Sequence, residues 1–302
     1  MSGDLLLFKD GRFKLLAPLG AAANGGVFLA DDLRDKRQVA LKLLEIARVP
    51  EEAQERFLAE ARVLSTVRHK HVVHSLAGGH DNGFVWYAMD LMSGGSLRDH
   101  VKDKGACPPE PSVCAVFQIL MALDCVHAVG LIHRDVKLTN AMVGPDGTVR
   151  LSDFGIAHHP EGSVPFTTVP GQALGTPGYG APEQWDDAGQ VGPPADIFAA
   201  GVLLYRLLTR RRPDRLHLAH YRSGLLDDVP KPLRKVVLGS TFVDLERRYS
   251  TVLEMARALA NARDELLDVK EADIWIERFR DPDAHWGDAF DPLFNWFESE
   301  PA

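Results

Sequence analysis

One short stretch of the sequence gathers side chains that could transfer a charged group. It reads His133-Arg134-Asp135-Val136-Lys137-Leu138-Thr139-Asn140, and a further acid, Asp153, follows Asn140 by thirteen residues. Phosphoryl transfer needs a donor phosphate in line with its acceptor, neutralisation of the phosphate charge and a group that positions the acceptor hydroxyl. A carboxylate, a lysine and an amide within six residues supply side chains for these tasks, so the stretch is a candidate active site.

Two more motifs relate this stretch to a known family. The triplet Asp153-Phe154-Gly155 follows it, and Gly175-Thr176-Pro177-Gly178-Tyr179-Gly180-Ala181-Pro182-Glu183 comes next. Together the three motifs resemble the catalytic loop, the metal-binding triplet and the end of the activation segment of protein kinases. The sequence Ala-Pro-Glu-Gln and the short connections look most like the bacterial Hanks-type Ser/Thr kinases. The resemblance covers roughly residues 12–262.

The resemblance implies a role for each residue of the catalytic loop. Asp135 would accept the proton of the acceptor hydroxyl or orient that hydroxyl, and Lys137 would neutralise the γ-phosphate. A lysine at this position is typical of Ser/Thr kinases. Asn140 and Asp153 would bind Mg²⁺. Leu138 stands where the family usually has proline.

The resemblance also implies an ATP site in the first ninety residues. Lys42, in Val39-Ala40-Leu41-Lys42, would hold the α- and β-phosphates and pair with Glu60. Gly20 and Gly25 match the first and third glycines of the phosphate-covering loop, whereas Ala22 replaces the second. Met89 would be the gatekeeper of the hinge that binds adenine. The residues expected to contact the nucleotide or its metal are Leu19, Gly20, Gly25, Val27, Ala40, Lys42, Met89, Asp90, Met92, Asn140 and Asp153.

The segment between the triplet and Glu183 is the expected site of regulation. Arg134 precedes the catalytic Asp135, and in kinases with that arginine a phosphate on the activation loop often pairs with it. We therefore expect autophosphorylation at Thr167 or Thr168. A Thr-rich, solvated loop is the alternative. Thr176 would contact the catalytic loop and help to seat a Ser/Thr acceptor.

The resemblance also implies structural roles for three further residues. Glu183 would form a buried ion pair with Arg248. Asp196 would anchor the catalytic loop from beneath.

Hydrophobic periodicity predicts the elements that must position these residues. Short alternating runs predict strands at 13–19, 26–30, 39–44, 72–76 and 84–91, with one amphipathic helix at 50–67. Apolar helices are expected at 111–129, 197–208 and 251–267. The expected fold class is α+β: a two-lobe protein kinase fold with a small antiparallel sheet lobe, about 12–90, and a larger, mostly helical lobe, about 93–262.

Composition narrows the classes of partner. The net charge is −8, which disfavours nucleic acid, and the absence of a signal sequence or long apolar run leads us to expect a cytoplasmic protein with no membrane partner. Residues 263–302 hold twelve acidic and four basic side chains and three of the five tryptophans. This tail has two interpretations, a helix that folds back on the large lobe or a docking segment for a partner.

Two alternatives to an active protein kinase remain. Ala22 in the glycine-rich loop is compatible with a pseudokinase-like module that binds nucleotide or acts as a scaffold. A small-molecule phosphotransferase would share the His-x-Asp loop. Thr176, Ala181-Pro182-Glu183 and Arg248 argue against that class, because in the resemblance they build a peptide-binding platform.

Overall fold

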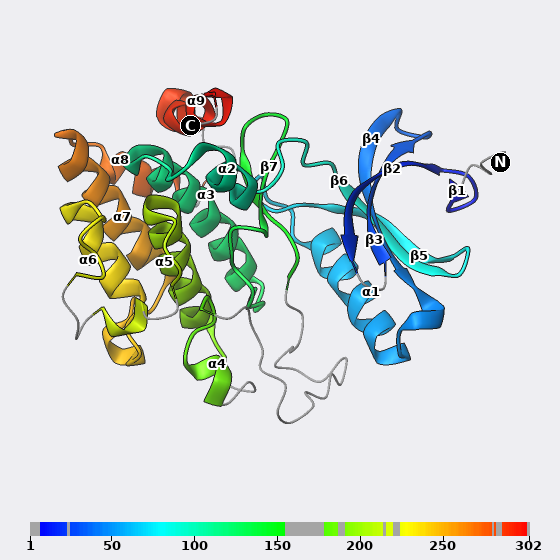
Figure 1. Cartoon of the computed structure of the whole chain (residues 1–302), viewed down its shortest axis with the longest axis horizontal. Helices are drawn as coiled ribbons and strands as arrows, with labels where there is room; N and C mark the ends of the chain where they lie inside the picture. The colour runs from blue at the N-terminus through cyan, green and yellow to red at the C-terminus, as the bar shows by residue number, and fades with distance from the viewer. Residues whose placement is uncertain are drawn as a thin grey trace. The chain divides into compact units, whose positions relative to one another are not determined.

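The computed structural model describes residues 7–22, 25–154, 178–186, 191–213, 216–219, 224–279, 281 and 286–300. These residues form two compact units. Of these described residues, the first unit comprises those up to 68 together with 72–93, and the second comprises 69–71 and those from 94 onward. The first is built on a sheet and the second is mostly helical, which confirms the predicted α+β fold (Figure 1).

The first unit is an antiparallel sheet with the strand order β1-β2-β3-β4-β6-β5. Its core consists of buried apolar side chains that include Phe8, Phe13, Leu41 and Trp86. Strands that follow one another in the chain pair in the sheet, with one exception. After β4 the chain passes through helix α1 to the edge strand β5, and β6 then returns to lie between β4 and β5. The strands are β1 Leu7–Phe8, β2 Phe13–Ala22, β3 Gly25–Asp32, β4 Arg37–Glu45, β5 Ser75–Asp81 and β6 Phe84–Asp90.

Helix α1 (Glu51–Thr66) packs on β5 and β6 of this sheet. Pro50 precedes its first residue, and Glu51 and Glu52 place negative charge at the positive end of the helix dipole. Phe57, Ala61 and Leu64 are buried at helical spacing, as the sequence predicted. The buried face fixes the rotation of the helix about its axis.

One predicted strand is displaced. The run at 72–76 was expected to be a strand, but β5 begins at Ser75 and continues to Asp81. Val72 and Val73 are buried outside any strand. A Cβ at Gly78 would lie 3.1 Å from both Trp86 O and Tyr87 Cβ, so β5 uses glycine to approach β6 closely. This glycine removes the apolar alternation that marks a strand in the sequence.

The second unit surrounds helix α3, whose side chains from Pro111 to Leu123 are all buried. A short hairpin, β7 (Ala141–Val143) with β8 (Val149–Leu151), lies beside it. Short 3₁₀ turns occur at Leu216–Leu218, Leu245–Arg247 and Gly287–Phe290. The helices are α2 Leu97–Lys104, α3 Pro109–Ala128, α4 Glu183–Asp186, α5 Pro193–Thr209, α6 Lys231–Ser240, α7 Val252–Leu267, α8 Ala272–Arg278 and α9 Asp291–Glu298.

Helix α3 is, within the described residues, the one helix long and apolar enough to cross a membrane. However, 78% of its apolar window is buried inside the unit, where α3 contacts α5, α7 and α9. This is the pattern of a core helix.

The acidic tail lies on the same unit. Trp275, Phe279 and Trp286 surround Phe117 of α3 with ring centroids 4.7, 5.3 and 5.6 Å away. All four side chains are at least nine-tenths buried. The predicted boundary at residues 262 and 263 falls inside α7, because the buried face of that helix continues to Arg263.

Candidate active site

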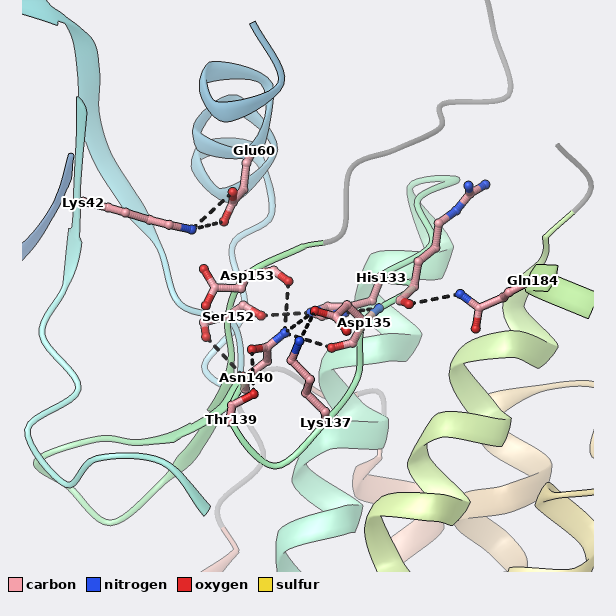
Figure 2. Close-up of polar contacts among 11 residues, drawn as sticks. Lys42, Glu60, His133, Asp135, Lys137, Thr139, Asn140, Ser152, Asp153 and Gln184 are labelled. Atoms are coloured by element: carbon pink, nitrogen blue, oxygen red, sulfur yellow. Dashed lines mark hydrogen bonds and ion pairs between the residues drawn. The ribbon is translucent and has the colours of Figure 1, made fainter. Parts of the chain in front are cut away.

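The catalytic-loop residues form one hydrogen-bonded cluster in the second unit (Figure 2). Lys137 Nζ lies 2.6 Å from Asp135 Oδ2. Asn140 Nδ2 donates to the backbone oxygen of Asp135 at 2.9 Å and to its Oδ2 at 3.0 Å. The Asp135 side chain is 25% exposed and that of Lys137 is 23% exposed, so both can reach solvent or a substrate. The loop therefore presents a carboxylate whose orientation two neighbours fix.

A buried carboxylate, Asp196 at the start of α5, anchors this loop. Its Oδ2 accepts the backbone N–H of His133 at 2.8 Å, and its Oδ1 accepts that of Arg134 at 2.7 Å. His127 Nε2 also lies 2.8 Å from Oδ2. Burial alone would raise the pKa of Asp196, but the hydrogen bonds from His127 and His133 outweigh burial and lower it. An ionised Asp196 can therefore hold Arg134 at its unusual φ of +67°.

The ring of His133 links the loop to the strand that carries Asp153. His133 Nε2 donates to Ser152 O at 3.0 Å, and its Nδ1 accepts the backbone N–H of Asp135 at 3.3 Å. Burial lowers the pKa of His133, which favours the neutral ring that this pair of bonds requires. The ring of Phe154 packs against the same ring in a tilted arrangement, with centroids 4.6 Å apart. Asp153 itself has a φ of +53°, a second strained position at the site.

In the first unit, Lys42 on β4 points toward Glu60 on α1 (Figure 2). Lys42 Nζ lies 3.2 Å from Glu60 Oε1 and 3.4 Å from Oε2, which confirms the predicted pair. Tyr87 on β6 donates its hydroxyl to Glu60 Oε1 at 2.8 Å. The Tyr87 ring also lies 5.4 Å from the ammonium of Lys42. Glu60 on α1 and Tyr87 on β6 thus both hold the ammonium of this lysine.

Strand register aligns the other nucleotide candidates with this pair. Gly20 pairs with Val27, Val27 with Lys42, and Lys42 with Tyr87, so one row crosses β2, β3, β4 and β6. Directly opposite residues of an antiparallel sheet share a face, so Val27, Lys42 and Tyr87 project to one side. A second pair, Ala40 with Met89, lies two residues along. Of the other candidates in this unit, Leu19 lies within β2 beside Gly20. Gly25 begins β3, Asp90 ends β6 and Met92 follows two residues later.

An ion pair and an amide support the segment after the activation loop. Arg248 Nη1 lies 2.5 Å from Glu183 Oε1 and Nη2 lies 3.1 Å from Oε2, which confirms the predicted pair. The Arg248 side chain is fully buried. Gln184 Nε2 donates to Arg134 O at 3.1 Å and connects this segment to the catalytic loop.

Three residues that support the site gave no signal in the sequence. Tyr87, Gln184 and His127 were not predicted, because each acts through a hydrogen bond to a residue far along the chain. Thr167, Thr168 and Thr176 lie outside the described residues.

Comparison with known proteins decides the family. The profile of the protein kinase domain matches residues 13–227. The chain belongs to the protein kinase family. This match and the relatives described next confirm the resemblance to bacterial Hanks-type Ser/Thr kinases, the enzyme class and the two-lobe fold.

The relatives of this kinase include curated bacterial proteins. It is 32% identical over 271 residues to serine/threonine-protein kinase PknL of Mycobacterium bovis, a match that covers 85% of this chain and 67% of PknL. It is 34% identical over 280 residues to serine/threonine-protein kinase pkn2 of Myxococcus xanthus, covering 86% of this chain and 33% of pkn2. It is 28% identical over 270 residues to serine/threonine-protein kinase PrkC of Bacillus subtilis, covering 84% and 41%. The kinase thus spans two thirds of PknL and less than half of the other two.

A buried histidine holds the strand that leads to Asp153 in this kinase. His71 Nδ1 lies 2.9 Å from Val149 O, and His71 O accepts the backbone N–H of Leu151 at 2.8 Å. His71 is 1% exposed. Burial first, and then the nearby His69, Lys70 and Arg150, lower the pKa of His71 to about 3, although the hydrogen bond to Val149 O acts in the opposite direction.

This histidine should make stability depend on pH. Because the folded pKa is lowered from 6.5, the unfolded chain binds the proton first, and stability present above pH 6.5 is lost as pH falls toward 3. We expect His71 to account for a loss of about 2 kcal/mol between pH 7 and pH 5. Urea unfolding at both values should show a smaller loss for His71→Asn, which cannot titrate. The exposed His80→Asn should keep the wild-type loss. An equal loss in wild type and His71→Asn would contradict this.

Proposed function

We propose that this kinase transfers the γ-phosphate of ATP, in a Mg²⁺-dependent reaction, to serine and threonine hydroxyls of proteins. The observation that carries the proposal is the cluster of Asp135, Lys137 and Asn140, joined by hydrogen bonds of 2.6–3.0 Å on a loop anchored by Asp196. A degenerate kinase usually lacks at least one member of the catalytic set. All of them are present here.

Each residue of the cluster has a defined task. Asp135 orients the acceptor hydroxyl and accepts its proton as the hydroxyl oxygen bonds to the γ-phosphorus and the bond from that phosphorus to the departing ADP breaks. Lys137, which lies beside that carboxylate, offsets the negative charge of the phosphoryl group in transit. Lys42, held by Glu60 and Tyr87, binds the α- and β-phosphates. The backbone and side chains at Leu19, Gly20, Gly25, Val27, Ala40, Met89, Asp90 and Met92 hold the rest of the nucleotide.

The metal-ligand candidates fit Mg²⁺. Asn140 uses its amide nitrogen to bind Asp135, and its oxygen, which accepts the Thr139 hydroxyl at 3.2 Å, has a second lone pair to offer a cation. Asp153 adds a carboxylate. Mg²⁺ prefers such hard oxygen ligands and commonly takes the others from phosphate and water. Within the described segments, no three His, Cys, Asp or Glu side chains gather as a separate metal cluster. When bound, the cation neutralises phosphate charge.

The choice of Ser and Thr rests on Lys137, on Thr176 and on the names of the relatives, which are serine/threonine-protein kinases. The Glu183–Arg248 pair supports a protein substrate, because it fixes the segment that precedes α5 as a platform. A protein that uses ATP in this way would act in the cytoplasm.

The proposal is tested by incubating the kinase with γ-labelled ATP, Mg²⁺ and a basic model protein, followed by phosphoamino-acid analysis. We expect label in phosphoserine and phosphothreonine, and its loss on addition of EDTA. Label confined to phosphotyrosine would reject the acceptor class. Undiminished transfer in EDTA would reject the metal requirement.

We also expect autophosphorylation of the activation segment. After incubation with Mg-ATP, mass spectrometry should find phosphate on Thr167, Thr168 or both. Thr167→Ala with Thr168→Ala should lower activity toward a protein substrate by about 10-fold, because the phosphate would order the segment through Arg134. An unmodified segment in a fully active kinase would contradict this expectation.

A further inference from the structure

The β7–β8 hairpin carries the two metal-ligand candidates at its ends. Asn140 immediately precedes β7, and Asp153 lies two residues after β8. Ala141 pairs with Leu151, and Ser152 N donates to Asn140 O at 2.8 Å. The separation of Asn140 from Asp153 is therefore set by the hairpin, and a displacement of the hairpin would move both residues.

The chain that leads into α2 holds one edge of this hairpin. Gly94 N donates to Val143 O at 3.0 Å, and Val143 N donates to Gly95 O at 2.8 Å. Ser96 and Asp99 then form a capping box that starts α2. The first turn of α2 is thus fixed to β7.

Helix α9, from the acidic tail, covers the turn of the hairpin. Gly147 has a φ of +71°, and a Cβ at this position would collide with the ring of Phe294. Glycine thus permits direct contact between the turn backbone and that ring. Phe294 nonetheless remains 44% exposed, so the ring covers the turn without being fully buried itself.

The same α9 is held at its other end by α2. Lys104, the last residue of α2, donates to the carbonyl oxygens of Trp296 at 3.1 Å, Phe297 at 2.5 Å and Ser299. A cation at a helix C-terminus satisfies unpaired carbonyls and complements the helix dipole. The ring of His100 lies 4.6 Å from that of Phe297. Helix α2, the hairpin and α9 therefore each contact the other two.

We propose that α9 is a positioning element of the kinase. By holding Gly147 with Phe294, while Lys104 holds α9, it fixes the hairpin and thereby the placement of Asn140 and Asp153 for the divalent cation. The tail thus acts on cation binding without touching the cation. The part that concerns the cation rests on the proposed function, whereas the effect on the hairpin does not.

Two variants, one from each side, test this proposal in the full chain. Phe294→Ala removes the ring on the turn, and Lys104→Met removes the ammonium but keeps the apolar stem. Lys102→Met is the matched control, since Lys102 is an exposed lysine of the same helix. Hydrogen exchange of the 141–151 amides and calorimetric Mn²⁺ binding, with a non-hydrolysable ATP analogue present, are the measurements.

We expect both variants, and not the control, to exchange faster in the hairpin and to bind Mn²⁺ roughly 3-fold or more weakly. Affinity for the analogue without metal should be unchanged. If the variants lower only the melting temperature, with hairpin exchange and Mn²⁺ affinity as in wild type, the proposal is overturned. A different result would separate the two proposals. If wild type itself binds no Mn²⁺ and transfers no phosphate, while the two variants still exchange faster than wild type in the hairpin, the proposed function is overturned but the coupling of α9 to the hairpin stands.

Discussion

Asp135→Asn should reduce phosphate transfer by about 10³-fold, within the range by which removal of a general base slows enzymes. The substitution keeps the size of the side chain but removes the proton acceptor and the carboxylate that Lys137 approaches at 2.6 Å. Single-turnover transfer of labelled phosphate to a protein substrate measures the effect. Binding of ATP should persist, since the nucleotide candidates around Lys42 belong to the other unit.

A surface acid outside the site and outside the β7–β8 hairpin supplies the control for this prediction. Asp228 pairs with Arg211 at 2.5 Å, and its side chain is 51% exposed. Asp228→Asn should leave the transfer rate within about 2-fold of wild type, because exposed ion pairs contribute little. Equal labelling in wild type and Asp135→Asn would instead favour a pseudokinase-like module that binds nucleotide or serves as a scaffold.

Trp275→Ala should lower the free energy of unfolding by about 3–5 kcal/mol, the usual cost of truncating a buried large aromatic residue. Trp275 is 3% exposed and packs against Phe117, Trp286 and Phe290, with centroids 4.7, 5.5 and 5.7 Å away. Arg263 also lies 4.6 Å above its ring. Urea unfolding measures the change.

The neighbouring Ile274 provides a matched control, because it is on the same helix but 46% exposed. Ile274→Ala should cost less than about 1 kcal/mol. Similar losses in the two variants would mean that the tail contacts contribute little to stability. Such a result would favour the interpretation of the tail as a docking segment.

The sequence predicted elements where one face of the element is buried. In α1 the spacing of Phe57, Ala61 and Leu64 was sufficient, because a single apolar stripe faces the sheet. The apolar pattern misplaced β5, where Gly78 lies so close to β6 that a Cβ would come within 3.1 Å of Trp86 O. Hydrophobic periodicity depends on the side chains, so it does not detect a strand whose place in the sheet depends on close approach of the backbone.

The candidate site divides in the same way. The resemblance of residues 133–140 and 153–155 to protein kinase motifs was enough to single out Asp135, Lys137, Asn140 and Asp153 as candidates, and the structure joins the first three by hydrogen bonds. The supporting residues Tyr87, Gln184 and Lys104 could not be predicted from the sequence. They act through hydrogen bonds to Glu60, to Arg134 O and to the end of α9. Those partners are 27, 50 and 193 residues away, and only tertiary packing brings them together.

The cover on Phe117 also has a consequence for synthesis on the ribosome. Phe117 is fully buried, but three of the rings that bury it belong to residues 275–286, which are translated about 160 residues later. At bacterial elongation speeds the nascent chain would expose this ring for on the order of 10 s. The core around Phe117 therefore stays incomplete during synthesis until residues 275–286 have emerged from the ribosome.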